Sequence, residues 1–213
     1  AGDVAAIREH RDASEAELKR RAPDANVLHL ATHGFVLGKT CRESAGAQRG
    51  VGGLVPSASH ASPPELPPID LLGVSGLALA GANLRAEVPV SDEDGIVTAM
   101  ELAHLELDGV DWAVLSACDT GVGESISGEG VFGFRRAFRV AGAGSVIMSL
   151  WPVEDEATLR WMELLYRARL ERRMTTAESV HQASLGLLRE RRSRGESTHP
   201  FTWGAFVAAG DWR

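Results

Sequence analysis

The sequence lacks the features of several protein classes. Only two cysteines, Cys41 and Cys118, occur in 213 residues. A disulfide framework needs more cysteines in a much shorter chain, so we expect a reducing, cytoplasmic environment. No apolar run approaches the roughly 18 residues that a membrane helix needs, and a membrane is not an expected partner. The chain begins with Ala1 and not with methionine, which predicts a piece of a longer protein.

A basic excess is also missing, because the formal net charge is −7 at neutral pH. Such a chain cannot neutralise phosphates broadly, so we expect no direct nucleic-acid partner. Histidines 29 and 33 are four residues apart, but on a strand and its loop instead of one helical face. No second cluster of ligands completes a zinc site, and we expect neither a metal nor an organic cofactor.

What the sequence does contain is typical of one soluble globular domain across residues 1–213, with 44% hydrophobic and 24% charged residues. Short apolar runs predict strands at 27–31, 77–80, 112–116, 145–150 and 203–209. Helical patterns cover 3–22, in two pieces because of a capping box at Ser14, then a short stretch after Thr98, about 130–142, 155–172 and 176–192. This alternation predicts an α/β fold with a largely parallel sheet and helices on both faces.

The segment from Gly38 to Pro68 interrupts this alternation. Its composition changes to glycine, serine, alanine and proline, which predicts a long, exposed and mobile loop instead of a second domain. The loop is either a lid, a processing site with Arg42 and Arg49 as basic candidates, or a passive surface insertion. The passive insertion is the simplest of these interpretations.

In parallel α/β sheets, ligands bind at the carboxyl ends of the strands. That rule selects the three loops that begin at Thr32, Ala117 and Trp151. His33 lies in the first loop and Cys118 in the second, so neighbouring strands would bring an imidazole and a thiol together. A base near a cysteine favours the reactive thiolate, and a histidine can protonate a leaving amine.

Glycines next to both side chains fit this chemistry, because Gly34 and Gly121 let the backbone approach a substrate and aim N–H groups at an oxyanion. On spacing alone, a buried structural cysteine and an ordinary loop histidine remain the simpler interpretation. A nucleotide site is a third interpretation, since residues 128–133 (GEGVFG) match the GxGxxG pattern. They begin too far after the preceding strand for that mechanism.

Longer motifs favour the catalytic interpretation. Residues 28–34 (LHLATHG) and 114–121 (VLSACDTG) resemble the CHAT family, caspase-like peptidase domains of clan CD that are related to separase. The resemblance continues through 127–130 (SGEG), 149–158 (SLWPVEDEAT) and 199–206 (HPFTWGAF), and covers the chain from about Asn26 to its end. It implies a caspase-like α/β fold with a His33–Cys118 dyad. It also implies that the backbone N–H groups of Gly34 and Cys118 hold the oxyanion.

The third loop provides an expectation about specificity. Residues 150–155 (LWPVED) resemble the separase segment whose aspartate receives a substrate arginine, which implies that Asp155 lines the pocket for the P1 residue. Asp119, beside the nucleophile, is a second candidate. We therefore expect cleavage after arginine or lysine. Asp155 also opens a predicted helix, where an acidic residue is favoured by the helix dipole alone.

The resemblance implies a cysteine endopeptidase that acts on a specific protein in bacterial-type regulated signalling, cell death or defence. Family members are often attached to tetratricopeptide repeats, so an upstream repeat or sensor region is an expected partner. The N-terminal region departs from the family, because a helical pattern replaces strand-forming sequence. We therefore expect either an edge strand upstream of Ala1 or a sheet that lacks its N-terminal edge strand. The alternative function is a catalytically silent, caspase-like scaffold or regulatory interaction module.

Overall fold

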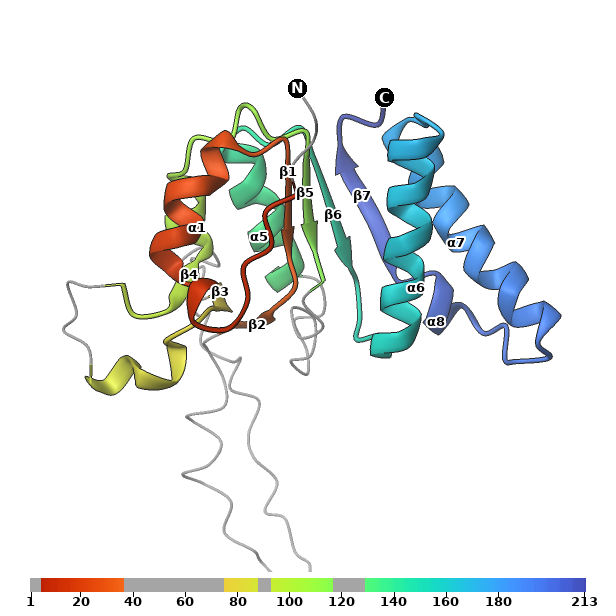
Figure 1. Ribbon diagram of the computed structural model, residues 1–213, viewed down its shortest axis with the longest axis horizontal. Helices are drawn as coiled ribbons and strands as arrows, with labels where there is room; N and C mark the ends of the chain where they lie inside the picture. Colours follow the sequence, from red (N-terminus) through yellow and green to blue (C-terminus); the bar gives the residue numbers. More distant parts are fainter. Residues whose placement is uncertain (1–4, 37–74, 88–92, 117–128) are drawn as a thin grey trace, which may run out of the picture.

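A four-stranded sheet organises the fold. The computed structural model describes residues 5–36, 75–87, 93–116 and 129–213. In sheet order, the strands are β1 (Val27–Leu30), β5 (Trp112–Leu115), β6 (Ser145–Ser149) and β7 (Phe206–Gly210). The first three run parallel, and β7 runs antiparallel to β6 (Figure 1). The prediction of a largely parallel sheet is confirmed, and β1 forms one edge of it.

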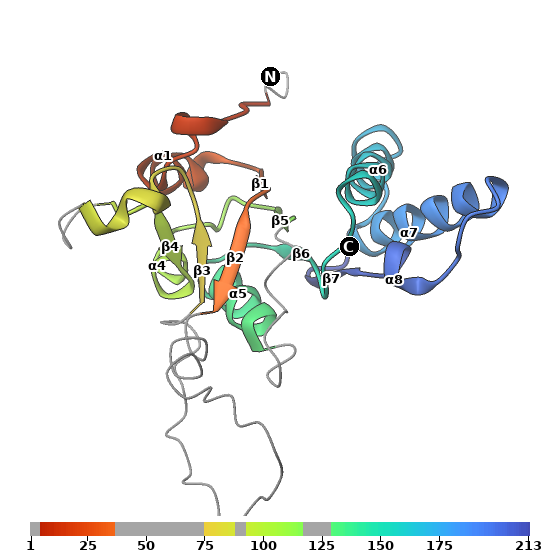
Figure 2. The same ribbon diagram turned by 90° about the horizontal axis from the view of Figure 1, so that it is seen from below.

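Helices cover both faces of this sheet, as predicted. On one face lie α1 (Glu15–Arg21), α4 (Ala99–Ala103) and α5 (Glu129–Val140), and on the other α6 (Asp155–Tyr166) and α7 (Thr176–Ser193) (Figures 1 and 2). The alternation of side chains along β5 explains the two layers. Ala113 and Leu115 pack with the first group of helices, whereas Trp112 and Val114 pack with the second.

A second, smaller sheet was not predicted from the sequence. It is antiparallel and contains β2 (His33–Val36), β3 (Ser75–Ala78) and β4 (Ile96–Thr98), in the order β2-β3-β4. It lies on the same side of the main sheet as α4 and α5 (Figure 2). The 3₁₀ helix η3 (Ala82–Glu87) follows β3.

The N-terminal helix prediction was partly wrong. Residues 5–9 have no helical structure, and regular structure starts with a 3₁₀ turn, η1 (His10–Asp12). The capping box predicted at Ser14 is confirmed in part: the Ser14 side chain accepts a hydrogen bond from the backbone N–H of Glu17, whereas the Glu17 carboxylate accepts from Arg8 and Arg20. After α1, the short 3₁₀ helix η2 (Ala22–Asp24) leads into β1. The capping box at Thr98 is confirmed in full, with Glu101 as the reciprocal partner.

The C-terminal elements follow the prediction with local differences. The helix predicted over 155–172 is α6 followed by a π-helical segment, η4 (Arg167–Glu171). The strand predicted from Trp203 begins later, because Pro200–Trp203 forms a short helix, α8, with proline in its first turn. The predicted long loop from Gly38 to Pro68, with Cys41, Arg42 and Arg49, lies outside the described residues.

Candidate functional site

The carboxyl ends of three parallel strands meet at one edge of the main sheet. Leu30, the last residue of β1, is in register with Leu115, the last residue of β5. Leu115 is in register with Met148 near the end of β6. The backbone N–H of Ser116 also donates to the carbonyl of Leu30 at 3.0 Å. The expectation that these three strand ends gather at one edge is therefore confirmed.

His33 lies three residues beyond the end of β1, and its setting differs from the loop that we expected. It is the first residue of β2, has an exposed side chain and is in register with Ala78 of β3. The hydroxyl of Thr32 donates a hydrogen bond to the carbonyl of Ala78. Gly34 is buried and is in register with Leu77. A strand, and not a free loop, therefore holds the candidate catalytic histidine.

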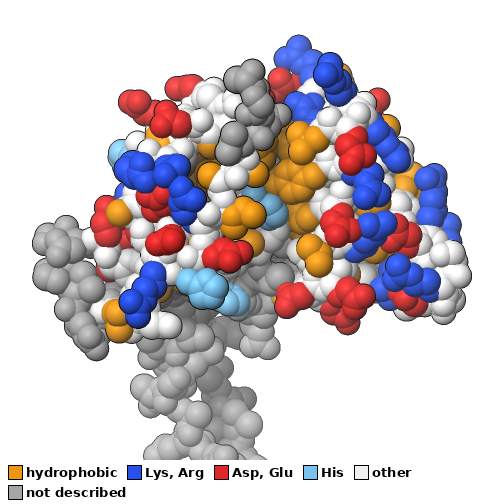
Figure 3. All heavy atoms as spheres, viewed as in Figure 1, with side chains coloured by type: hydrophobic (Ala, Val, Ile, Leu, Met, Phe, Trp, Pro, Cys, Tyr) orange, Lys and Arg blue, Asp and Glu red, His pale blue; other side chains and the backbone are white. Residues whose placement is uncertain are grey.

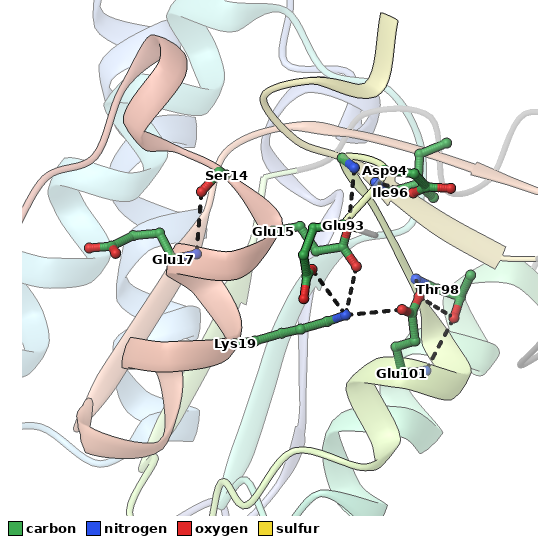
Figure 4. Close-up of polar contacts among 10 residues, drawn as sticks. Ser14, Glu15, Glu17, Lys19, Glu93, Asp94, Ile96, Thr98 and Glu101 are labelled. Atoms are coloured by element: carbon green, nitrogen blue, oxygen red, sulfur yellow. Dashed lines mark hydrogen bonds and ion pairs between the residues drawn. The ribbon is translucent and has the colours of Figure 1, made fainter. Parts of the chain in front are cut away.

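The small sheet that carries His33 is attached to α1 by a buried carboxylate. Glu15 is only 2% exposed, and its carboxylate accepts a hydrogen bond from the backbone N–H of Gly95 at 3.0 Å. The carbonyl of Gly95 in turn accepts from the N–H of Leu79 at 2.7 Å. These bonds connect α1 to the ends of β3 and β4 (Figure 4).

Lys19 joins the same cluster. Its ammonium lies 2.7 Å from Glu15, 3.0 Å from Glu101 and 3.2 Å from Glu93 (Figure 4). Desolvation disfavours the charged lysine, but hydrogen bonds to the three carboxylates prevail and raise the pKa of Lys19. For Glu15, desolvation outweighs the nearby ammonium and raises the pKa above its usual value. The cluster fixes α1, β4 and α4 relative to one another.

The candidate nucleophile follows the end of β5. Ser116 is the last described residue there, and Cys118, Asp119 and Gly121 lie outside the described residues. The pairing of Cys118 with His33 thus remains a prediction, as does the placement of Asp119. What the structure places together are the ends of the two strands that precede them.

Asp155 is described, and its backbone environment agrees with the sequence pattern. It is the first residue of α6, with Glu154 as N-cap, and its side chain is exposed. The segment that leads to it is held against the C-terminal region. Trp151 stacks on Phe201 with ring centroids 5.8 Å apart, and its indole N–H donates to the Phe201 carbonyl at 2.7 Å. The exposed position leaves the Asp155 carboxylate accessible to a ligand.

A hydrogen-bonded trio was missed in the sequence analysis. His29 Nε2 lies 2.9 Å from the Ser116 hydroxyl, and His29 Nδ1 lies 3.0 Å from the Tyr166 hydroxyl. Although part of the histidine ring is exposed, the surrounding protein desolvates it and lowers its pKa. A signal was present, since His29 and Ser116 are the polar members of two otherwise apolar strand ends. Tyr166 lies too far along the chain to be connected to them by pattern.

Within residues 5–36, 75–87, 93–116 and 129–213, no group of three or more histidine, cysteine or acidic side chains is arranged to hold a metal. Over the same ranges, every helix is too short or too polar to cross a bilayer.

Comparison with known proteins identifies the relationship of the whole chain. Residues 2–211 match the model of the CHAT domain family. No curated protein matches the chain. The match spans both sheets, the three strand ends and the segments on which the sequence resemblance depends.

Proposed function

The chain belongs to the CHAT domain family, which is caspase-like and related to cysteine peptidases, and from this premise we propose that it is a cysteine endopeptidase. Cys118 is the nucleophile and His33 its acid–base partner. The observation that carries the proposal is the register of Leu30 with Leu115. It brings the chain that leads to His33 beside the chain that leads to Cys118.

The chemistry requires no group beyond these residues and water. His33 takes the proton of the Cys118 thiol, and the thiolate attacks the carbonyl carbon of the scissile peptide bond. Backbone N–H groups of Gly34 and Cys118 stabilise the oxyanion. His33 protonates the departing amine as the C–N bond breaks, which leaves a thioester. His33 then takes a proton from water, the hydroxide attacks the thioester, and the thiol and a new carboxylate are released.

Specificity for a basic P1 residue rests on Asp155. Its carboxylate is exposed at the start of α6, and α6 follows β6, whose carboxyl end lies beside that of β5. A carboxylate binds an arginine side chain bidentately and a lysine side chain as a point charge. Asp119 is the second candidate for this contact, because it directly follows Cys118 in the sequence.

The substrate in this proposal is a specific protein, and an upstream repeat or sensor region controls its cleavage in a signalling, cell-death or defence response. This part rests on the family relationship alone.

Hydrolysis of a peptide panel that differs only at P1 tests the proposal. We expect the wild type to cleave after arginine and lysine, but not after aspartate or leucine. Cys118→Ala and His33→Ala should abolish cleavage, whereas the matched variant Cys41→Ala should retain it. Cleavage that survives in Cys118→Ala would exclude the proposed nucleophile, and a preference for P1 aspartate would exclude the proposed pocket.

A further inference from the structure

We propose that Tyr166, His29 and Ser116 form a positioning network for the nucleophile: they fix the end of β5 from which the chain runs on to Cys118. This inference rests on the proposed function, since it assigns to Cys118 the reactivity that the network supports. None of the three residues is part of the proposed dyad.

Ser116 is placed where its position most directly affects the chain that leads to Cys118. It is the first residue after β5, and Cys118 comes two residues later in the sequence. Two bonds hold it to β1: its N–H donates to the Leu30 carbonyl at 3.0 Å, and its hydroxyl lies 2.9 Å from His29 Nε2. The backbone bond fixes the position of Ser116 along the strand direction. The side-chain bond fixes the orientation of Ser116 about the chain axis.

His29 reaches Ser116 because of the strand period. On β1, Leu28 and Leu30 pack on the side of α1 and α5, so His29 faces the opposite side, which α6 and α7 cover. His29 is in register with Val114, and Ser116, directly after β5, is two residues further along and faces the same way. The two side chains therefore meet across adjacent strands by geometry.

Tyr166 anchors the far end of the network. It is the last residue of α6, directly before the π-helical segment η4, a kind of distortion that is frequent at functional sites. Its ring lies against His29 and Trp112, at centroid distances of 5.7 and 6.5 Å. Trp112 is itself fixed, because its indole N–H donates to Thr176 at 3.0 Å and Arg169 lies over its ring at 5.1 Å.

The imidazole couples the two hydrogen bonds to each other. A neutral histidine carries one ring proton, so one ring nitrogen donates while the other accepts. Whichever way the Tyr166 bond runs therefore determines which way the Ser116 bond runs. A change at Tyr166 is thereby transmitted to Ser116 without direct contact.

The network lies at the protein surface. Its effect on the position of Cys118 can therefore be distinguished from an effect on folding stability. Hydrophobic and histidine side chains are visible over β1, between α1 and α6 (Figure 3). His29 is exposed, so water can satisfy its nitrogens when a partner is removed. Loss of one hydroxyl should therefore cost little stability, but Ser116 should no longer be held in one orientation.

The test compares Ser116→Ala, Ser116→Thr and Tyr166→Phe with the wild type in the full chain. The readouts are the iodoacetamide labelling rates of Cys118 and Cys41, the separate kcat and KM for peptide hydrolysis, and the melting temperature. We expect Ser116→Ala and Tyr166→Phe each to slow labelling of Cys118 and to lower kcat by about fivefold to tenfold, the factor for one hydrogen bond. KM, the melting temperature and Cys41 labelling should not change.

Two further variants sharpen the test. Ser116→Thr retains the hydroxyl and should restore Cys118 labelling. Ser193→Ala removes another exposed hydroxyl, one that donates to the Glu190 carbonyl at 2.8 Å, and should have no effect. The double variant Ser116→Ala/Tyr166→Phe should be no slower than either single variant, because both act through His29.

Failure of this inference and failure of the proposed function give different results. Wild-type hydrolysis with unchanged labelling and kcat in Ser116→Ala and Tyr166→Phe would overturn the network and leave the peptidase intact. A wild type that cleaves no peptide, but whose Cys118 labelling still depends on Ser116 and Tyr166, would overturn the peptidase and support the network. Slower labelling that follows a lower melting temperature would show a purely structural role and overturn the inference.

Discussion

Leu30 and Leu115 are in register as the last residues of two adjacent parallel strands. One strand continues toward His33, and the other toward Cys118. Because this pairing is made by backbone hydrogen bonds, it does not depend on either reactive side chain. A variant that lacks His33 or Cys118 should therefore retain the fold, so that its loss of activity can be attributed to chemistry.

Asp155→Asn tests the proposed recognition of a basic P1 residue. Removing the charge should lower kcat/KM for P1-arginine peptides by about tenfold to 100-fold, since a charge-assisted pair is lost. Glu154→Gln, one residue earlier and also exposed, is the matched control and should change kcat/KM by less than about twofold. Equal effects of both variants would indicate a general electrostatic contribution. No effect of Asp155→Asn would exclude Asp155 and leave Asp119 as the candidate contact for the P1 residue.

Lys19→Met should destabilise the attachment of α1 to the small sheet. It leaves the 2%-exposed Glu15 without its nearest cation, and we expect a loss of about 2 kcal/mol in the free energy of unfolding at pH 7. Arg20→Met, on the exposed side of the same helix, should cost about 0.5 kcal/mol or less. Urea unfolding of both variants measures the difference.

The pH dependence of Lys19→Met follows from the raised pKa of Glu15. A carboxyl group whose pKa is higher in the folded than in the unfolded protein binds its proton more tightly when folded. Its ionisation therefore opposes folding above the folded pKa, and this penalty is relieved as the pH falls toward the unfolded value of 4.5. Because Lys19 lowers the pKa of Glu15, its removal raises that pKa further and enlarges the penalty. The stability deficit of Lys19→Met relative to the wild type should therefore shrink between pH 7 and 5. A deficit that grows over this range would contradict the account.

Tyr166 can be titrated without interference, because it is the only tyrosine in the sequence. Desolvation raises its pKa to about 12. The phenolate absorbance after a rapid jump to alkaline pH, read before the chain unfolds, should give one transition near that value. A midpoint at the usual value of 10 would show that the phenol is more hydrated than its packing against His29 and Trp112 allows.

Gly95→Ala should disturb the turn that joins the small sheet to α1. Gly95 has φ of +80°, and a Cβ there would lie 2.3 Å from the backbone nitrogen of Ala82. We expect a loss of more than about 2 kcal/mol in the free energy of unfolding. Gly195 also has a positive φ, of +69°, but a Cβ there meets nothing within 4 Å. Gly195→Ala should therefore cost only about 1 kcal/mol, and equal losses would contradict the packing argument.

The main sheet could be predicted from the sequence because its strands are continuous apolar runs. Residues 112–115 are buried on both faces, and this is the pattern that a central strand of a parallel sheet produces. The helix start at Thr98 was equally readable, since the capping box is a local motif with a fixed spacing.

The small sheet could not be predicted in the same way. The strand predicted at 77–80 overlaps β3, but β4 has only 3 residues and β2 begins with His33 and Gly34, so neither forms a continuous apolar run of strand length. The assignment of His33 to a loop was wrong for this reason, since its strand exists through pairing with the distant Ala78. The 3₁₀ start of the N-terminal region was missed because helix propensity in residues 5–9 is not supported by any buried face.

The network of Tyr166, His29 and Ser116 was beyond sequence reasoning for a different reason. His29 is 87 residues from Ser116 and 137 residues from Tyr166 along the chain. Each residue alone has an ordinary explanation, and only the order of strands β1 and β5 with the end of α6 brings them together. Chemistry that is spread over distant elements requires the tertiary structure.

The most direct test of the central claim is the site-resolved rate of iodoacetamide labelling at neutral pH, measured by mass spectrometry in the wild type and in His33→Ala. If Cys118 is a nucleophile activated by His33, it should be labelled at least about tenfold faster than Cys41, and His33→Ala should remove most of that difference. Equal and slow labelling of both cysteines, unchanged in His33→Ala, would contradict the claim and favour a catalytically silent scaffold.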